Sequence, residues 1–204
     1  MASVLAHLAI AKEYIRKNPE GVKNHQEFYD GSVMADLHVD KDFTHYLGKY
    51  ENETDLVRRF KEKFNVEKFA RHCKFDRDMN LAMLLHLFSD RSFFNELFPK
   101  EYLQTVSLKQ FRADYSHVMD AHETFITEKY GVSFDMVSPE VGKALNQSLA
   151  EYKAKNAGKQ VATDAKLVYS EKDLAKFIDF ASSVDLQKLI KQSKTSGVSC
   201  GVGK

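Results

Sequence analysis

The sequence predicts an all-α fold, and three observations support this prediction. Only nine glycines and three prolines interrupt the 204 residues. Apolar residues recur at spacings of three and four along most of the chain, which is the period of a helix face, whereas strand-like alternation is scarce. Residues that cap or end helices stand at the edges of these periodic segments. We therefore expect a compact bundle of several helices.

Two helices are expected near the N-terminus. Ser3 is suited to cap a helix through about Lys17, and Asn18-Pro19 should end it because the residue before a proline avoids helical geometry. A second helix is expected to begin near Asn24. Residues 31–48 mix a short helical turn with an acidic loop, and we assign no boundary there.

The middle of the chain should contain the central helix. Asn52 or Thr54 is expected to start a helix through Phe64, and Asn65 another through about His72. Residues 78–97 form the most apolar segment, with leucines around most of the helix circumference. A helix that is apolar on all sides must be buried, so we place it at the centre.

Three further helices are expected after the central one. Ser107 should open a helix to about Tyr130, ended by Gly131. A second should begin at Ser138-Pro139-Glu140, and a third should run over 170–191. We expect residues 1–155 to form a helical metal-site domain, and 156–204 to hold a connection, a closing helix and a flexible C-terminal tail.

Composition restricts the class of protein. Hydrophobic residues make up 43% and charged residues 29%, which excludes disordered and collagen-like chains. The formal charge of +1 provides no global field for a polyanion, so nucleic acid is not expected as an obligate partner. No stretch reaches the roughly 18 apolar residues of a transmembrane helix. The first eleven residues lack a basic leader, and we expect a cytoplasmic protein.

Several familiar catalytic motifs are missing from the sequence. It has no glycine-rich phosphate loop, and His122-Glu123 begins like a helical zinc-protease motif but lacks the second histidine. No histidine is followed directly by aspartate, so the His-Asp dipeptide of one large phosphohydrolase class is absent. These chemistries are not expected.

A histidine and an aspartate on the central helix are the first candidates for chemistry. His86 and Asp90 are four residues apart in LLHLFSD, so both project from one helix face into an apolar setting. A divalent metal would satisfy both groups. An ordinary hydrogen bond within the helix would satisfy them too, and for this pair alone it is the preferred explanation.

Three more residues stand in similar apolar surroundings. His7 lies among Leu5 and Leu8, Asp36 follows Val-Met-Ala, and His45 lies between Phe43 and Tyr46. Each one separately is readily explained as a core or boundary residue. Five such residues together favour a shared role.

The order of these motifs resembles a known family. AHLAIA, GSVMAD, FTHYLG and HLFSD occur in sequence, which resembles the zinc-dependent phospholipase C family, specifically its small bacterial members without a secretion signal. The segment FRADYSHVMDAHETFITEKYGV, residues 111–132, also resembles those members. The resemblance covers Ser3 to about Val132 and fades afterwards.

The resemblance implies an all-α bundle with a metal site between helices. It implies that His45, His86 and Asp90, with Asp36, bind one zinc, and that Asp90 bridges to a second metal held with the help of His7. It also implies hydrolysis of a phosphoester, such as a phospholipid or a nucleotide, by metal-activated water. Asp36 and Asp90 are then the catalytic candidates, and Asp36 either binds metal or orients and deprotonates the water.

The chain also departs from the family. Secreted members use a freed amino terminus as a ligand, and they have further ligands downstream that we cannot place here. The candidates for these are Glu96, Asp114, His117, Asp120 and His122. Asp114 matches the small members best, and His117 follows it by three residues, although a solvated helix face explains His117 and His122 as well. We therefore expect one or two zinc ions, with manganese or iron as alternatives for these nitrogen and oxygen ligands.

Two other readings remain open. One is a non-catalytic helical interaction or scaffold protein whose metal site is structural or vestigial, with its 15 Phe and 9 Tyr filling a core or an association surface. The other is a helical metal bundle that handles thiols or small electrophiles, usually with three histidines and no bridging aspartate. The helix over 170–191 either closes the bundle or mediates self-association into a homo-oligomer.

Overall fold

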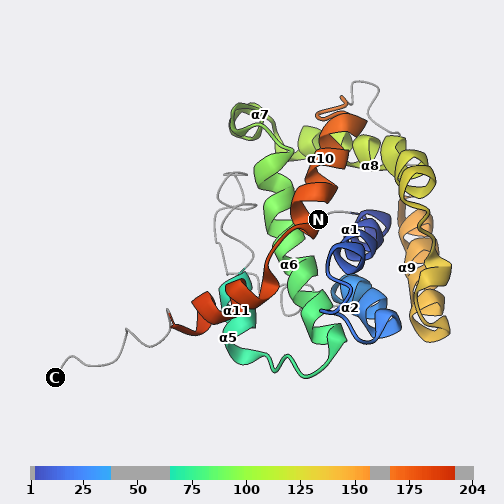
Figure 1. Cartoon of the computed structure of the whole chain (residues 1–204). Helices are drawn as coiled ribbons and strands as arrows, with labels where there is room; N and C mark the ends of the chain where they lie inside the picture. The colour runs from blue at the N-terminus through green and yellow to red at the C-terminus, as the bar shows by residue number, and fades with distance from the viewer. Residues whose placement is uncertain (1–2, 38–64, 157–165, 196–204) are drawn as a thin grey trace.

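In a computed structural model, the structure describes residues 3–37, 65–156 and 166–195, and within them all regular secondary structure is helical (Figure 1). The all-α prediction is therefore confirmed. The elements are α1 (Val4–Lys17), α2 (His25–Leu37), α5 (Val66–His72), α6 (Asp78–Glu96), α7 (Lys100–Thr105), α8 (Leu108–Tyr130), the 3-10 turn η1 (Phe134–Met136), α9 (Pro139–Asn156), α10 (Glu171–Ser182) and α11 (Leu186–Thr195). The expected helix over 52–64 lies outside the described residues.

Most helix ends lie where capping residues predict them. The side chain of Ser3 accepts a hydrogen bond from Ala6 N at 3.2 Å, and Asn65 and Ser107 cap α5 and α8 in the same way. Gly131 ends α8 with a φ of 57°, a left-handed conformation that suits glycine. These local signals explain why the sequence predicts the boundaries well.

Helix α6 lies at the centre of the bundle, as predicted (Figure 1). It packs against α2 and α1 on one side and against α5 and α11 on the other, and α10 crosses it. Its C-terminal half contributes to a buried aromatic cluster shared with α8, α10 and the segment before α10. The cluster comprises Phe93, Phe94, Phe98, Phe111, Tyr169 and Phe177.

Helix α2 continues through Gly31 and Ser32 to Leu37, whereas the sequence indicated only a short helical turn and an acidic loop over 31–48, with no boundary. The two helices approach closely at this point, because a Cβ atom on residue 31 would lie 2.3 Å from the Met79 carbonyl oxygen of α6 and 2.8 Å from Met79 Cα. The glycine therefore serves close helix packing, and its conformational freedom is not needed. The correction matters because α2 carries Asp36 near its C-terminal end.

The C-terminal segment forms two helices instead of the single helix predicted over 170–191. Helix α10 ends at Ser182, and the Asp185 side chain accepts from Lys188 N at 2.9 Å to start α11. Lys17 of α1 reaches the end of α10 and donates to the Asp179 carbonyl at 2.8 Å and to the Ser183 hydroxyl at 2.7 Å. The break thus has a local cap at Asp185 and a distant contact from a residue more than 160 positions earlier in the chain.

A second lysine of α1 caps another distant helix. Lys12 Nζ donates to the carbonyl oxygens of Tyr130 and Gly131, at 2.7 Å and 2.9 Å, where α8 ends. A cation at the negative end of a helix dipole is favourable, and the same holds for Lys17 at α10. Helix α1 is therefore attached through charge-assisted hydrogen bonds to two helices of the C-terminal half.

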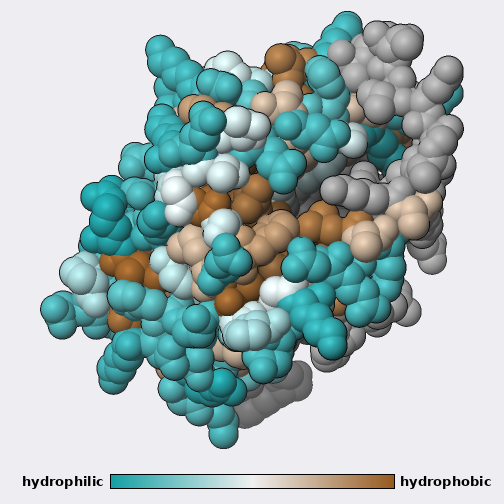
Figure 2. Space-filling view, turned by 90° about the vertical axis from the view of Figure 1, so that its right-hand side faces the viewer, coloured by the Kyte–Doolittle hydropathy of each residue, from teal (hydrophilic) through white to brown (hydrophobic). Residues whose placement is uncertain are grey.

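Large apolar side chains of the described residues are mostly buried. Leu167 and Phe180 are the exposed ones, at 57% and 47% of their surface. Figure 2 shows one face on which hydrophobic residues form a band between hydrophilic ones. Across residues 3–37, 65–156 and 166–195, no helix combines the length and apolarity needed to cross a membrane.

Candidate metal centre

Four of the predicted site residues meet where three helices cross. His7 comes from α1, Asp36 from α2, and His86 and Asp90 from α6. His7 Nε2 lies 3.3 Å from Asp90 Oδ1 and 3.8 Å from Asp36 Oδ2, and His86 Nε2 lies 3.4 Å from Asp90 Oδ2. One ligand atom each from His7, His86 and Asp90 lie within 4.8 Å of one another. We call these four residues the His-Asp cluster.

The cluster is almost completely removed from water. His7 and His86 expose 1% of their surface and Asp90 exposes none, whereas the Asp36 side chain is 9% exposed. Ionised carboxylates in such a setting carry a large desolvation cost unless cations or hydrogen-bond donors compensate it. The chemistry of the cluster therefore depends on where its protons and positive charges are.

The two imidazole rings lie face to face. Their centroids are 3.9 Å apart with an interplanar angle of 24°. Burial lowers the pKa of His7, and the neighbouring His86 lowers it further, while the Asp90 and Asp36 carboxylates act in the opposite direction. Two imidazolium ions at this distance would also repel each other. The neutral form of His7 is therefore favoured over an imidazolium–carboxylate pair.

Hydrogen bonds on the far side of each ring orient the cluster. His86 Nδ1 donates to the Ser32 carbonyl of α2 at 2.8 Å, since a carbonyl oxygen only accepts. His7 Nδ1 lies 3.1 Å from the hydroxyl of Ser89. Both rings consequently direct Nε2 toward the carboxylates. Neither Ser32 nor Ser89 was a candidate from the sequence, although they lie inside the GSVMAD and HLFSD motifs.

The remaining predicted ligands do not join this group. His45 lies outside the described residues. Asp114 is fully buried, but its carboxylate accepts from the Tyr102 hydroxyl at 2.5 Å and from the Gln110 amide and Lys166 N, both at 2.8 Å. Burial would raise the pKa of Asp114, but these hydrogen bonds outweigh it and the pKa is lowered. Asp114 thus joins α7, α8 and the segment before α10.

The other downstream candidates occupy varied environments. His117 is half-buried, and Glu96 and Asp120 are exposed. His122 is buried at 3% exposure, contrary to the solvated face considered for it, and its Nε2 donates to the Tyr169 carbonyl at 3.2 Å. Within the described part of the chain, His7, His86 and Asp90 are the one group with metal-ligand spacing.

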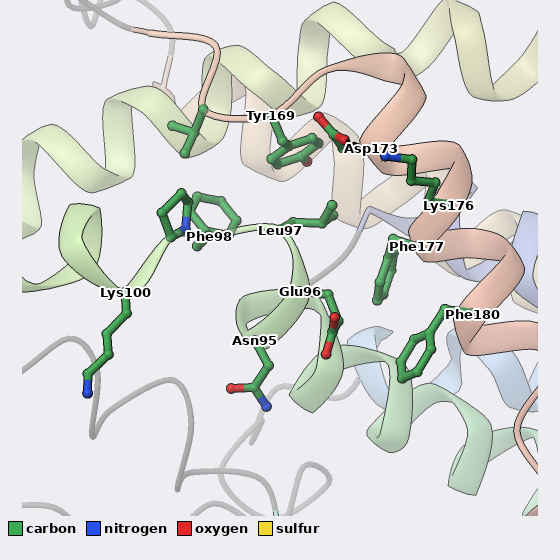
Figure 3. Close-up of a pocket in the computed structure, with 12 residues that line it drawn as sticks. Asn95, Glu96, Leu97, Phe98, Lys100, Tyr169, Asp173, Lys176, Phe177 and Phe180 are labelled. Carbon is green, nitrogen blue, oxygen red and sulfur yellow. Dashed lines mark hydrogen bonds and ion pairs between the residues drawn. The ribbon is translucent and has the colours of Figure 1, made fainter.

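A surface hollow lies beyond the C-terminal end of α6 and is separate from the cluster. It has a volume of about 510 Å³ and is lined by residues of α6, α7 and α10 and by the segment before α10. Figure 3 shows Phe177 and Phe180 projecting from α10 toward Glu96 and Leu97. No residue of the His-Asp cluster lines it. This hollow is therefore not the approach to the cluster.

The fold and the cluster define an all-α protein with a buried site of two histidines and two aspartates. Compared with models of protein families, with curated proteins and with solved structures, the chain gives no match. Any assignment of function therefore rests on the cluster itself and on the motif order.

Proposed function

We propose that the His-Asp cluster binds divalent metal and that the protein is a metal-dependent hydrolase of small phosphate esters. One observation supports metal binding. The Nε2 atoms of two stacked imidazoles face the carboxylates of Asp36 and Asp90 in a nearly solvent-free interior. An imidazole lone pair and a carboxylate oxygen that face each other repel, and a divalent cation between them would turn this repulsion into coordination.

The donor set fits such a metal. It contains nitrogen and oxygen atoms without thiolate, which suits zinc and also manganese or iron. Asp90 presents Oδ1 to His7 and Oδ2 to His86, so one carboxylate serves both histidines. His7, His86 and Asp90 would hold the metal, since one ligand atom of each lies within 4.8 Å of the others.

The phosphoester chemistry rests on the resemblance to the zinc-dependent phospholipase C family. Bound divalent ions supply Lewis acidity and activate water for attack on phosphorus. Asp36 is the least buried member of the cluster and lies 3.8 Å from His7 Nε2. We assign to it the acceptance of a proton from the attacking water, and we place the approach of substrate on its side. Asp90, which faces both histidines, would hold the metal.

A non-catalytic metal site is the second candidate. The near-complete burial of His7, His86 and Asp90 favours it, because structural metal sites are closed whereas catalytic sites keep an open position. In that case the ion stabilises the contact of α1, α2 and α6 and no substrate reaches it. Metal binding is common to both candidates, so metal content and turnover must be measured separately.

Metal content is the first test. The full chain is purified without chelator and analysed for zinc, manganese and iron, and we expect one to two equivalents of one of them. Less than about half an equivalent, before and after incubation with each metal, would overturn the proposal. The double variant His86→Ala/Asp90→Ala should lose the metal, whereas His25→Ala, which removes an exposed histidine of α2, should retain it.

Turnover is the second test. Wild-type protein is expected to hydrolyse bis(p-nitrophenyl) phosphate or p-nitrophenyl phosphate. The double variant is expected to lose this activity, because it lacks two of the residues that would hold the metal. Stoichiometric metal without turnover of any phosphate ester would support the structural alternative. Activity that survives the double substitution would refute the mechanism.

A further inference from the structure

A serine inside the central helix makes contacts that determine how His7 can act. Ser89 is fully buried on α6, one residue before Asp90. Its hydroxyl lies 2.8 Å from the carbonyl oxygen of His86 and 3.1 Å from Nδ1 of His7. It therefore links the helix of His86 and Asp90 to α1.

The hydroxyl has one proton, and its partners determine where that proton goes. The His86 carbonyl can only accept, so the Ser89 hydroxyl donates to it. The oxygen of Ser89 then accepts from His7, which places the single proton of a neutral His7 ring on Nδ1. Nε2 of His7 has the lone pair. It has no hydrogen-bond partner, although Asp90 Oδ1 is 3.3 Å away.

We propose that Ser89 is a positioning residue that holds His7 in the Nδ1–H tautomer and thereby keeps Nε2 available to a metal ion. The purpose that we assign to Ser89 rests on the proposed function, namely metal binding. The tautomer of His7 can be tested without metal. The competing arrangement places the proton on Nε2, where it can be donated to Asp90, while Ser89 donates to Nδ1. In that arrangement Nε2 of His7 would have no lone pair with which to bind a metal ion.

The two arrangements predict different results for Ser89→Ala. Without the hydroxyl, Nδ1 of His7 loses its acceptor, and the ring gains by moving its proton to Nε2 and donating to Asp90. We expect metal affinity to fall about 10- to 100-fold, the usual effect of removing a group that orients a ligand. A purely structural serine would lower stability but would leave the tautomer unchanged.

Nitrogen NMR on the metal-free full chain tests the inference directly. Long-range ¹H–¹⁵N spectra, recorded where the imidazoles are neutral, distinguish the two tautomers. We expect Nδ1–H for His7 in the wild type, Nε2–H in Ser89→Ala, and Nδ1–H again in Ser89→Thr, which retains the hydroxyl. Ser92→Ala, which alters another buried serine of α6, is the matched control and should not change the tautomer.

Metal affinity, measured by competition with a chromogenic chelator, should follow the tautomer across the same variants. Nε2–H in the wild type, or Nδ1–H with unchanged affinity in Ser89→Ala, would overturn the inference. If Ser89→Thr fails to fold because its methyl group has no space, the comparison of wild type with alanine decides. A tautomer change in a protein that binds no metal would uphold the role of Ser89 and refute the proposed function.

Discussion

The close approach of α2 and α6 at Gly31 leads to a quantitative prediction. In Gly31→Ala the new Cβ would lie 2.3 Å, 2.8 Å and 2.9 Å from three backbone atoms of Met79, whereas ordinary van der Waals contact begins near 3.4 Å. Backbone cannot rotate away as a flexible side chain can. The two helices must therefore separate locally by roughly 1 Å, given that contacts between carbon atoms are best at about 3.5–4.0 Å.

The change in the free energy of unfolding of Gly31→Ala follows from two opposing effects. Overpacking a well-packed contact costs about 1–3 kcal/mol of unfolding free energy. Alanine in place of glycine within a helix returns about 1 kcal/mol. The clash is with backbone, so the upper end of the overpacking range applies; the net loss is then about 2 kcal/mol, which lowers Tm by roughly 4–8 °C in a protein of this size. The separation also moves the Ser32 carbonyl, which accepts from His86 at 2.8 Å, so we expect metal affinity to fall by about 10-fold.

Gly142→Ala provides the matched control. It places a methyl group within helix α9, where the nearest atoms would be 3.7 Å away, an ordinary contact. Thermal unfolding followed by circular dichroism, with metal affinity measured in parallel, should show loss in Gly31→Ala and unchanged or slightly increased stability in Gly142→Ala. If Gly31→Ala is as stable as Gly142→Ala and binds metal normally, the close helix contact does not hold the site in place.

Two further predictions concern groups outside the cluster. Lys17→Met removes the cation from the end of α10, and we expect it to lower the unfolding free energy by about 0.3–1 kcal/mol and to speed amide exchange in the last turn of that helix; exchange that is unchanged there would contradict the capping role. The pKa of Asp114 is lowered in the folded state, so its contribution to stability is complete above its unfolded value and is lost as pH falls through the folded one. Urea unfolding at pH 7, 4 and 2.5 should therefore show a smaller loss on acidification in Asp114→Asn than in wild type, and equal losses would show that other carboxylates account for the acid sensitivity.

The sequence predicts local features of this protein better than features that depend on the packing of distant segments. Ser3, Ser107 and Gly131 act within one turn of their own helices, so their positions alone indicate the boundaries. No boundary could be assigned from Gly31 onward, because nothing nearby in the sequence shows that another helix approaches this glycine. The break between α10 and α11 was missed although Asp185 is a local cap for α11, and the contact that Lys17 makes with the end of α10 is not visible in the local sequence.

In the candidate site, too, local signals can be predicted from the sequence, whereas the packing of distant segments cannot. The spacing of His86 and Asp90 is a local signal, and it places both on one helix face. That His7 and Asp36 converge on them depends on how α1 and α2 pack, and only the order of motifs indicated it in the sequence. Asp114 was a candidate ligand because it matches the small members of the zinc-dependent phospholipase C family best, and in the structure its carboxylate accepts hydrogen bonds from a tyrosine, a glutamine and a backbone amide.

The two lysines of α1 have a consequence for the order in which the described part of the chain folds. Lys12 and Lys17 find their partners 118 and 162 residues later in the sequence, so each contact closes a long loop. Contacts at such large sequence separations are opposed by loop-closure entropy until other contacts have formed. The final packing of α1, and with it the position of His7, should therefore be one of the last steps of folding.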